Sequence, residues 1–224
     1  MKLSGRLMLE AIGTYFLMLV VAIVTARDAS LALSALAIGA VLIAIVYSIG
    51  PHSWAHFNPS MSLAFWIRGT MPGREVVPYV IAQCFGALLA VFTQMLLIDP
   101  EGQFDPARSQ AVEAVVAANY GPVILGELLF TFALVFTTLH VATTRLQQGN
   151  QYFGLVVSSI VVAGILTMGP VASSVFNPAV QIGFWTMGID GPLSGFLVIA
   201  SSLFGAALAA LAFKVAHGST QDQV

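Results

Sequence analysis

Two short stretches of this sequence decide its fold: residues 57–60 read Phe-Asn-Pro-Ser, and residues 176–179 read Phe-Asn-Pro-Ala. Asparagine is a favoured helix N-cap, and proline is favoured at the first helical position, where its missing N–H costs nothing. Each stretch therefore predicts a helix start. The apolar segments that begin there, residues 58–67 and 177–187, are only about half of the roughly 20 residues that a helix needs to cross a bilayer.

The composition around these segments is that of a membrane protein. Of 224 residues, 58% are hydrophobic and only 8% are charged, whereas about a quarter of the residues of a soluble domain are charged. This excludes a soluble enzyme and a disordered linker. The net charge of -2 leaves no basic surface for a polyphosphate, so no nucleic-acid partner is expected. The single cysteine, Cys84, excludes an intrachain disulfide.

Six further apolar runs are long enough to be read as membrane spans, with the lipid bilayer as the solvent of the fold. The first has no small-residue cleavage pattern after it, so it is interpreted as a span and not as a removable signal peptide. An even number of spans places both termini on the same side. The runs are residues 7–26, 31–49, 76–98, 123–143, 153–168 and 193–215.

The distribution of basic residues predicts the orientation, because short cytoplasmic loops carry an excess of Lys and Arg. With both termini inside, six basic residues lie inside and two lie outside. We therefore expect a multi-pass protein of the cell (inner) membrane with cytoplasmic termini, and an acidic outer loop at residues 99–121. The inside residues are Lys2, Arg6, Arg68, Arg74, Arg145 and Lys214, and the outside residues are Arg27 and Arg108.

The sequence repeats itself at an offset near 119. Residues 57–60 match 176–179, and Phe-Gly-Ala at 85–87 matches 204–206; Glu10 matches Glu127 at an offset of 117. With three spans in each half, the second copy enters the membrane from the opposite face. We predict one domain over residues 1–224, with repeat 1 at about 1–98 and repeat 2 at about 122–216, and with the two short segments meeting tip to tip near the midplane.

The paired helix starts carry the predicted chemistry. Each helix N-terminus has a partial positive charge of roughly half a unit, so two of them facing one region repel cations. The side-chain amides of Asn58 and Asn177 can donate to a passing oxygen atom and interrupt a chain of proton hopping. Donors without formal charge suit neutral polar solutes. An isolated Asn-Pro is usually a loop turn, but two copies at matched repeat positions favour the paired site.

Taken together, these features resemble the major intrinsic protein family, the aquaporins and aquaglyceroporins. The resemblance implies an all-α, aquaporin-like right-handed bundle of six transmembrane helices with two re-entrant half-helices, one pore per subunit and a homotetramer. It also implies that Glu10 and Glu127 are buried carboxylates that accept hydrogen bonds from the half-helix loops; a proton-relay role is the alternative. The motifs that carry the resemblance are Glu10-x-x-Gly13-Thr14, His56-Phe57-Asn58-Pro59, Ala82-Gln83 with Phe85-Gly86-Ala87, Glu127, and Phe176-Asn177-Pro178-Ala179.

The sequence departs from the family pattern at its expected selectivity constriction. Ser60 replaces the usual alanine, and Val180 stands where an arginine normally follows the second motif. Counting from the two asparagines places the constriction at Ile38, Ile165, Ser174 and Val180, which predicts a wide and apolar passage. Without the arginine, a bidentate donor and a positive barrier are lost. A bacterial branch of the family associated with arsenic resistance also lacks this arginine. Alternatively, another donor, such as Ser174 or His52, restores a narrow filter.

The remaining motifs add little chemistry. His56 matches the family histidine before the first Asn-Pro and is expected to line the inner mouth; no histidine pair has metal-ligand spacing, and no metal or cofactor is predicted. Two sets of small residues, beginning at Gly86 and Gly205, suit close helix crossings. We expect them to pack within the chain, with a subunit contact as the alternative.

The sequence as a whole predicts a passive channel for small uncharged solutes: water, glycerol-like polyols and metalloid acids such as arsenite. It shows no catalytic machinery, and an enzyme is not expected. Two other classes remain open. An ion-coupled secondary transporter also uses inverted repeats and broken helices, and a non-conducting junction or scaffold protein could share the fold.

Overall fold

The computed structural model describes residues 1–27, 29–98, 120–170 and 174–217. In these residues the regular structure is helical, and its helices follow the predicted order of spans and half-length segments. The helices are α1 (Leu3–Ala26), α2 (Leu31–Ser53), α3 (Pro59–Arg68), α4 (Gly73–Ile98), α6 (Tyr120–Thr143), the short 3₁₀ turn η1 (Arg145–Gln147), α7 (Phe153–Met168), α8 (Pro178–Thr186) and α9 (Pro192–His217).

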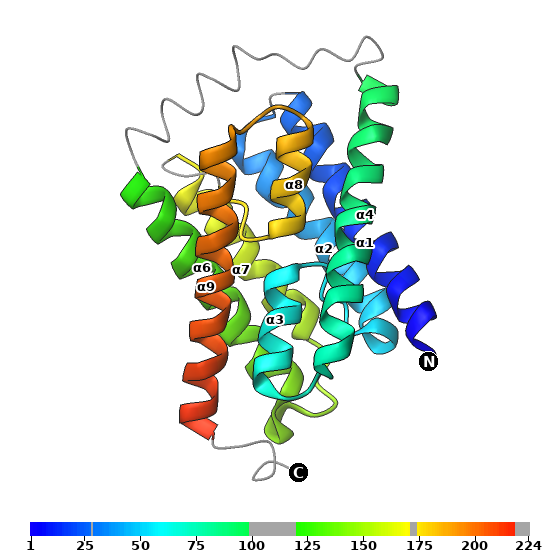
Figure 1. Ribbon diagram of the computed structural model, residues 1–224, viewed down its shortest axis with the longest axis vertical. Coiled ribbons are helices and arrows are strands. Elements are labelled where there is room, and N and C mark those ends of the chain that lie inside the picture. The colour runs from blue at the N-terminus through cyan, green and yellow to red at the C-terminus, as the bar shows by residue number, and fades with distance from the viewer. Residues whose placement is uncertain (28, 99–119, 171–173, 218–224) are drawn as a thin grey trace.

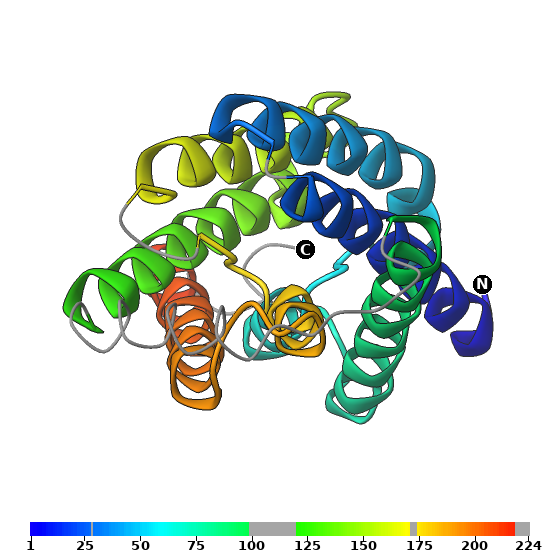
Figure 2. The ribbon, with the colours of Figure 1, turned by 90° about the horizontal axis from the view of Figure 1, so that it is seen from above.

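The six longer helices form an arc, and the two short helices lie between α4 and α9 at its open side (Figure 2). Helices α3 and α8 lie end to end along the long axis and begin near its middle, so they point in opposite directions (Figure 1). We call the end with α3, η1 and the start of α1 the terminal end, and the end with α8 the far end. This arrangement agrees with the inverted repeat that the sequence predicts.

The two short helices begin at their Asn-Pro pairs. Asn58 has extended backbone angles, and its Oδ1 accepts a hydrogen bond of 2.8 Å from the backbone N–H of Ser60. Asn177 caps α8 in the same way, with Ala179 as donor at 3.0 Å. Proline follows each asparagine at the first helical position. Both predicted caps are therefore present in the structure.

Five of the described helices are long and apolar enough to cross a membrane. The fifth predicted span, α7, has only 16 residues, which gives about 24 Å of helix against a hydrocarbon core of about 30 Å. Helix α7 ends at Met168, two residues before the described chain breaks, and it packs against α2 and α6 (Figure 2). The helix has the bounds that the sequence predicts for this run, and it is the shortest of the six longer helices.

The small residues at matched positions bring two pairs of helices close together. A Cβ atom at Gly86 of α4 would lie 2.2 Å from the backbone oxygen of Ala11 in α1, and one at Gly205 of α9 would lie 2.4 Å from that of Leu128 in α6. Such distances leave no room for a side chain. The prediction that these residues pack within the chain is confirmed.

Candidate functional site

A cavity of about 940 Å³ runs inside the bundle. Its walls include Thr25 and Ser34 toward the far end, and Trp54, Thr70 and Asn150 toward the terminal end. Among the described residues that line it, none is Asp, Glu, Lys or Arg. The described part of the lining therefore consists of apolar and neutral polar groups, with one histidine.

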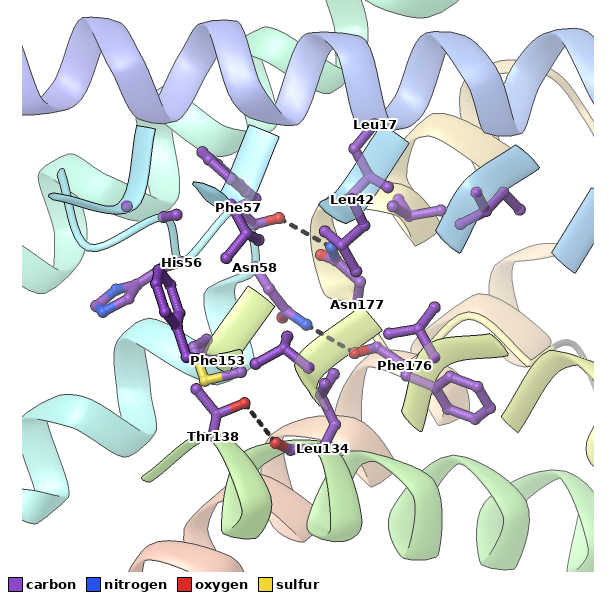
Figure 3. A pocket seen from close by; sticks show the side chains of 18 of the residues that line it. Leu17, Leu42, His56, Phe57, Asn58, Leu134, Thr138, Phe153, Phe176 and Asn177 are labelled. Carbon is purple, nitrogen blue, oxygen red and sulfur yellow. Dashed lines mark hydrogen bonds between the residues drawn. The ribbon is translucent and has the colours of Figure 1, made fainter. Parts of the chain in front are cut away.

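The two asparagines, Asn58 and Asn177, lie close together inside this cavity (Figure 3). We call this place, where α3 and α8 begin, the waist. Asn58 Nδ2 donates to the backbone oxygen of Phe176 at 2.8 Å, and Asn177 Nδ2 donates to that of Phe57 at 2.9 Å. Each half-helix is thus bonded to the loop that precedes the other. A side-chain amide has two N–H donors, so each asparagine keeps one N–H beyond this cross bond.

Apolar side chains stand opposite the amides. Figure 3 shows Leu17 and Leu42 to one side of the asparagines and Leu134 to the other, and all three line the cavity. The amide donors therefore lie between hydrocarbon side chains, and together they form an amphipathic passage. Such a passage suits a molecule with both hydroxyl and C–H surface.

Glu10 holds the loop before α3 in place. Its carboxylate is fully buried and accepts four hydrogen bonds: from Ser53 Oγ at 2.9 Å, from the backbone N–H of His56 at 3.0 Å and of Phe57 at 2.7 Å, and from Gln83 Nε2 at 2.9 Å. A buried carboxylate needs such donors to be stable. Because its oxygens are engaged with the loop, this carboxylate is not presented to the cavity.

Glu127 holds the loop before α8 with fewer bonds. It is also fully buried, and it accepts hydrogen bonds from the backbone N–H groups of Val175 at 2.7 Å and Phe176 at 2.8 Å. Among the described residues, both of these donors are backbone groups, whereas Glu10 also receives hydrogen bonds from two side chains. Each half therefore has a buried glutamate that holds its loop, but Glu10 makes more hydrogen bonds than Glu127 does.

The loops have an unusual backbone that explains why they need this anchoring. Phe57 and Phe176 have φ angles of 48° and 50°, and Ala55 and Ser174 have 48° and 54°. The left-handed region is unfavourable for residues with a side chain. The conformation persists because the glutamates and the cross bonds over-determine it.

The four residues predicted for the constriction all line the cavity, with side chains between 5% and 9% exposed. Ile38 lies on α2, Ile165 on α7, Ser174 in the loop before α8, and Val180 in the first turn of α8. All of these positions are toward the far end. The structure brings the four residues to one cavity; their role in selectivity stays a prediction.

The two histidines of the first loop region lie in different places. His56 lines the cavity, with its ring 4.3 Å from that of Phe65 and its Nδ1 3.1 Å from Ser62 Oγ. His52 is exposed on the last turn of α2, outside the cavity lining and about 14 residues of helix from Ile38. His52 therefore cannot supply a donor to the far-end constriction, which leaves Ser174 as the polar group there.

Sequence reasoning did not single out the lining residues Trp54, Thr138 and Phe153. A signal for Thr138 was available, because the repeat offset of 117 places it opposite Val21, which also lines the cavity. Phe153 aligns with Ser34 at the offset of 119. The repeat register therefore identifies lining positions, but not the side chains that differ between the halves.

The sequence was compared with models of known protein families. The family profile described as "MIP: Major intrinsic protein" matches residues 1–213. The chain belongs to the major intrinsic protein family. This major intrinsic protein shares its fold with the X-ray structure of the aquaglyceroporin from Plasmodium falciparum, at a TM-score of 0.75 and 17% sequence identity, over 94% of this chain and 95% of that chain.

Relatives of this major intrinsic protein include plant and archaeal aquaporins. Aquaporin NIP1-2 of Arabidopsis thaliana is 33% identical over 186 residues, which are 80% of this chain and 63% of the relative. Probable aquaporin AqpM of Archaeoglobus fulgidus is 34% identical over 140 residues, which are 62% of this chain and 56% of the relative. The chain thus spans about six-tenths of the length of these relatives.

Proposed function

We propose that this chain is a passive transmembrane channel for small uncharged solutes, with one pore in each subunit. The observation that carries the proposal is the cavity, whose described lining residues come from both ends of the bundle and include none with a formal charge. The family membership agrees with it, since two relatives are named aquaporins and the structural neighbour an aquaglyceroporin.

The asparagines act in this proposal as the central donors. The N–H that each amide keeps beyond its cross bond faces a solute oxygen at the waist. The N-termini of α3 and α8 add partial positive charge at the same place, which disfavours cations. A water or polyol oxygen is accepted there, whereas a hydrated cation is repelled.

The far-end constriction selects weakly in this proposal. Ile38, Ile165 and Val180 provide hydrocarbon and Ser174 one hydroxyl, so solutes larger than water are admitted. Glycerol-like polyols and neutral metalloid acids such as arsenite fit this description. His56 belongs to the opposite mouth.

Two of the proposed features concern the assembly and its location. The chain forms a homotetramer in a bacterial inner membrane, with both termini in the cytoplasm. The excess of Lys and Arg on the terminal side supports this orientation. Cysteine-accessibility labelling of residues at each end in intact cells tests the orientation, and mass measurement in detergent tests the tetramer.

Ion-coupled transport is the rival class, and the carboxylates argue against it. A coupled transporter needs an ionisable site on the solute path. Glu10 and Glu127 are instead bonded to the loops, and neither lines the cavity. Solute flux that depends on a proton or sodium gradient would support the rival.

Stopped-flow light scattering on reconstituted vesicles tests the proposal directly. We expect wild-type vesicles to conduct glycerol and arsenite passively, and Val180→Arg to reduce the flux of these solutes more than that of water, because the guanidinium adds bulk and charge beside the waist. Val180→Met adds bulk without charge and separates the two effects. A folded protein without flux for water or any solute would instead favour the scaffold class, and equal loss for all solutes in Val180→Arg would contradict the wide constriction.

A further inference from the structure

We propose that this channel sorts solutes by size at an aromatic mouth at its terminal end, and not at the far-end constriction. The aromatic mouth consists of Trp54, His56, Phe65 and Phe153, which all line the cavity. This inference rests on the proposed function, because it names the place where a passive pore limits its solutes.

The repeat register relates the residues of the far-end constriction to a matching set at the terminal end. At the offset of 119, the far-end constriction has a counterpart at the terminal end, and every member of both sets lines the cavity. The counterparts at the terminal end are apolar residues, and neither of the two sets contains an aromatic ring. The matched pairs are Ile38 with Val157, Ile165 with Val46, Ser174 with Ala55, and Val180 with Met61.

Next to these matched sets the two ends differ. Phe153 stands at the terminal end where the repeat places Ser34 at the far end, and His56 stands where the repeat places Val175. Figure 3 shows Phe153 and His56 on the same side of Asn58, away from Phe176. Phe65 has an aromatic counterpart in Phe184, which also lines the cavity. The two ends therefore differ by the rings of Phe153 and His56, which have the smaller Ser34 and Val175 as counterparts.

Phe153 is held in a fixed orientation. Its ring meets the edge of Tyr47 at a centroid distance of 5.4 Å, and a Cβ atom at Gly50 would lie 3.3 Å from two of its carbons. Tyr47 is fixed in turn, because its hydroxyl donates to the backbone oxygen of Gln151 at 2.9 Å. A side chain packed in this way has few rotamers and keeps a constant aperture.

Trp54 is held from the other direction. Its ring is stacked with that of Phe65 at 6.4 Å, and the guanidinium of Arg6 lies 5.4 Å from its centre. Arg6 is itself tied to Glu75 by contacts of 2.8 and 2.9 Å. The rings of Phe153 and Trp54 are therefore both held by neighbouring groups, whereas the far-end constriction consists of three aliphatic side chains and one serine.

Rigid rings and small aliphatic groups select solutes differently. Flux through a passive pore is limited by its tightest part, and pore diameter is a main determinant of what passes. Aromatic faces also accept the C–H side of a solute, while Thr138, beside Phe153 in Figure 3, offers a hydroxyl oxygen. The mouth thus suits narrow, uncharged polyols and rejects branched ones.

The test exchanges the side chains that distinguish the two ends. Wild type, Phe153→Ser and Ser34→Phe are reconstituted, and stopped-flow measures the permeability to water, glycerol and the branched tetrol pentaerythritol. We expect Phe153→Ser to raise the ratio of pentaerythritol to glycerol permeability by about ten-fold, the discrimination that a few missing carbons in a steric site provide. Ser34→Phe creates a second ring and lowers the ratio.

Three controls make the result decisive. Phe196→Ser changes an exposed phenylalanine of α9 outside the cavity and leaves the ratio unchanged. Phe153→Leu keeps an apolar contact with Tyr47 and still raises the ratio, which covers the case in which the serine variant does not fold. The third control, Val180→Ala, widens the far-end constriction. The inference is wrong if Val180→Ala raises the permeability ratio as much as Phe153→Ser does. It is also wrong if neither Phe153 variant raises the ratio. A wild type that conducts neither water nor glycerol contradicts the proposed function instead.

Discussion

At the scale of single residues, the two asparagines combine three tasks. Each Oδ1 caps its own half-helix, and each Nδ2 binds the opposite loop and still keeps one N–H. Replacement by another residue therefore affects stability and conduction together. Aspartate would keep the cap but lose the cross bond and place a charge at the waist.

The first prediction concerns Asn58→Ala. The substitution removes the cap on Ser60 and the bond to Phe176, and we expect it to lower the free energy of unfolding by about 1 to 3 kcal/mol and to reduce solute flux. Thermal unfolding in detergent and stopped-flow measure the two effects. Ser159→Ala, which removes an exposed hydroxyl bonded only within its own helix, is the control. Unchanged stability would mean that the cross bond contributes nothing.

The second prediction compares the buried carboxylates. In Glu10→Gln, the amide nitrogen faces groups that also donate, and about 2 to 4 kcal/mol of stability is lost, since each buried unsatisfied donor costs about 1 to 3 kcal/mol. Glu127→Gln leaves fewer donors unpaired and loses less. Unfolding midpoints of the two purified variants measure this order, and the reverse order would contradict the unequal anchoring described for the two loops.

At the scale of elements, close helix pairs position the half-helices between them. Helix α1 lies against α4, and α6 against α9, with glycine backbones at the contacts. In each pair, one helix carries the glutamate that anchors a loop. A shift of these helices would therefore move the loops and the waist.

The third prediction tests these contacts with Gly86→Ala. The new methyl group would lie 2.2 Å from the Ala11 oxygen, and we expect a loss of about 1 to 3 kcal/mol because backbone atoms cannot yield as a flexible side chain does. Gly121→Ala is the matched control: a Cβ there has nothing within 4 Å, and alanine is the better helix former by up to about 1 kcal/mol. Equal effects of the two substitutions would show that the close contact is not the cause.

The half-helices are the elements that the sequence predicts most completely. Their Asn-Pro starts, their half-length and their matched register are all visible in the chain, because capping is a local interaction. The partners of Glu10 could not be predicted in full. Ser53 and Gln83 reach it from α2 and α4, and such contacts depend on how each helix is rotated about its axis. The aromatic mouth was missed because Phe153 differs from its repeat counterpart.

At the scale of the whole molecule, the charges are arranged around the pore and not along it. The described basic and acidic residues lie outside the cavity lining, whereas the cavity has apolar walls and a waist of amide donors. This separation agrees with the neutral solutes that we propose for the channel. Among the described lining residues, the membrane potential therefore has no charged side chain to act on.

The fourth prediction follows from this arrangement. In planar bilayers, the protein should carry no measurable ion current at ±100 mV under conditions in which vesicles conduct glycerol, because a cation at the waist meets two positive helix ends without a counter-charge. Val180→Asp places an acidic group beside the waist, and a cation current in this variant is expected. A wild-type current that scales with the salt concentration would contradict the prediction.

The reciprocal bonds between each asparagine and the opposite loop also bear on how the protein is made. A ribosome delivers the first repeat to the membrane well before the second, so Asn58 is synthesised more than a hundred residues ahead of the carbonyl that it binds. The left-handed loop around Phe57 consequently lacks one of its restraints during synthesis. Completion of the pore is therefore a late event in biogenesis, and truncated nascent chains should expose the first loop to proteases that the finished protein resists.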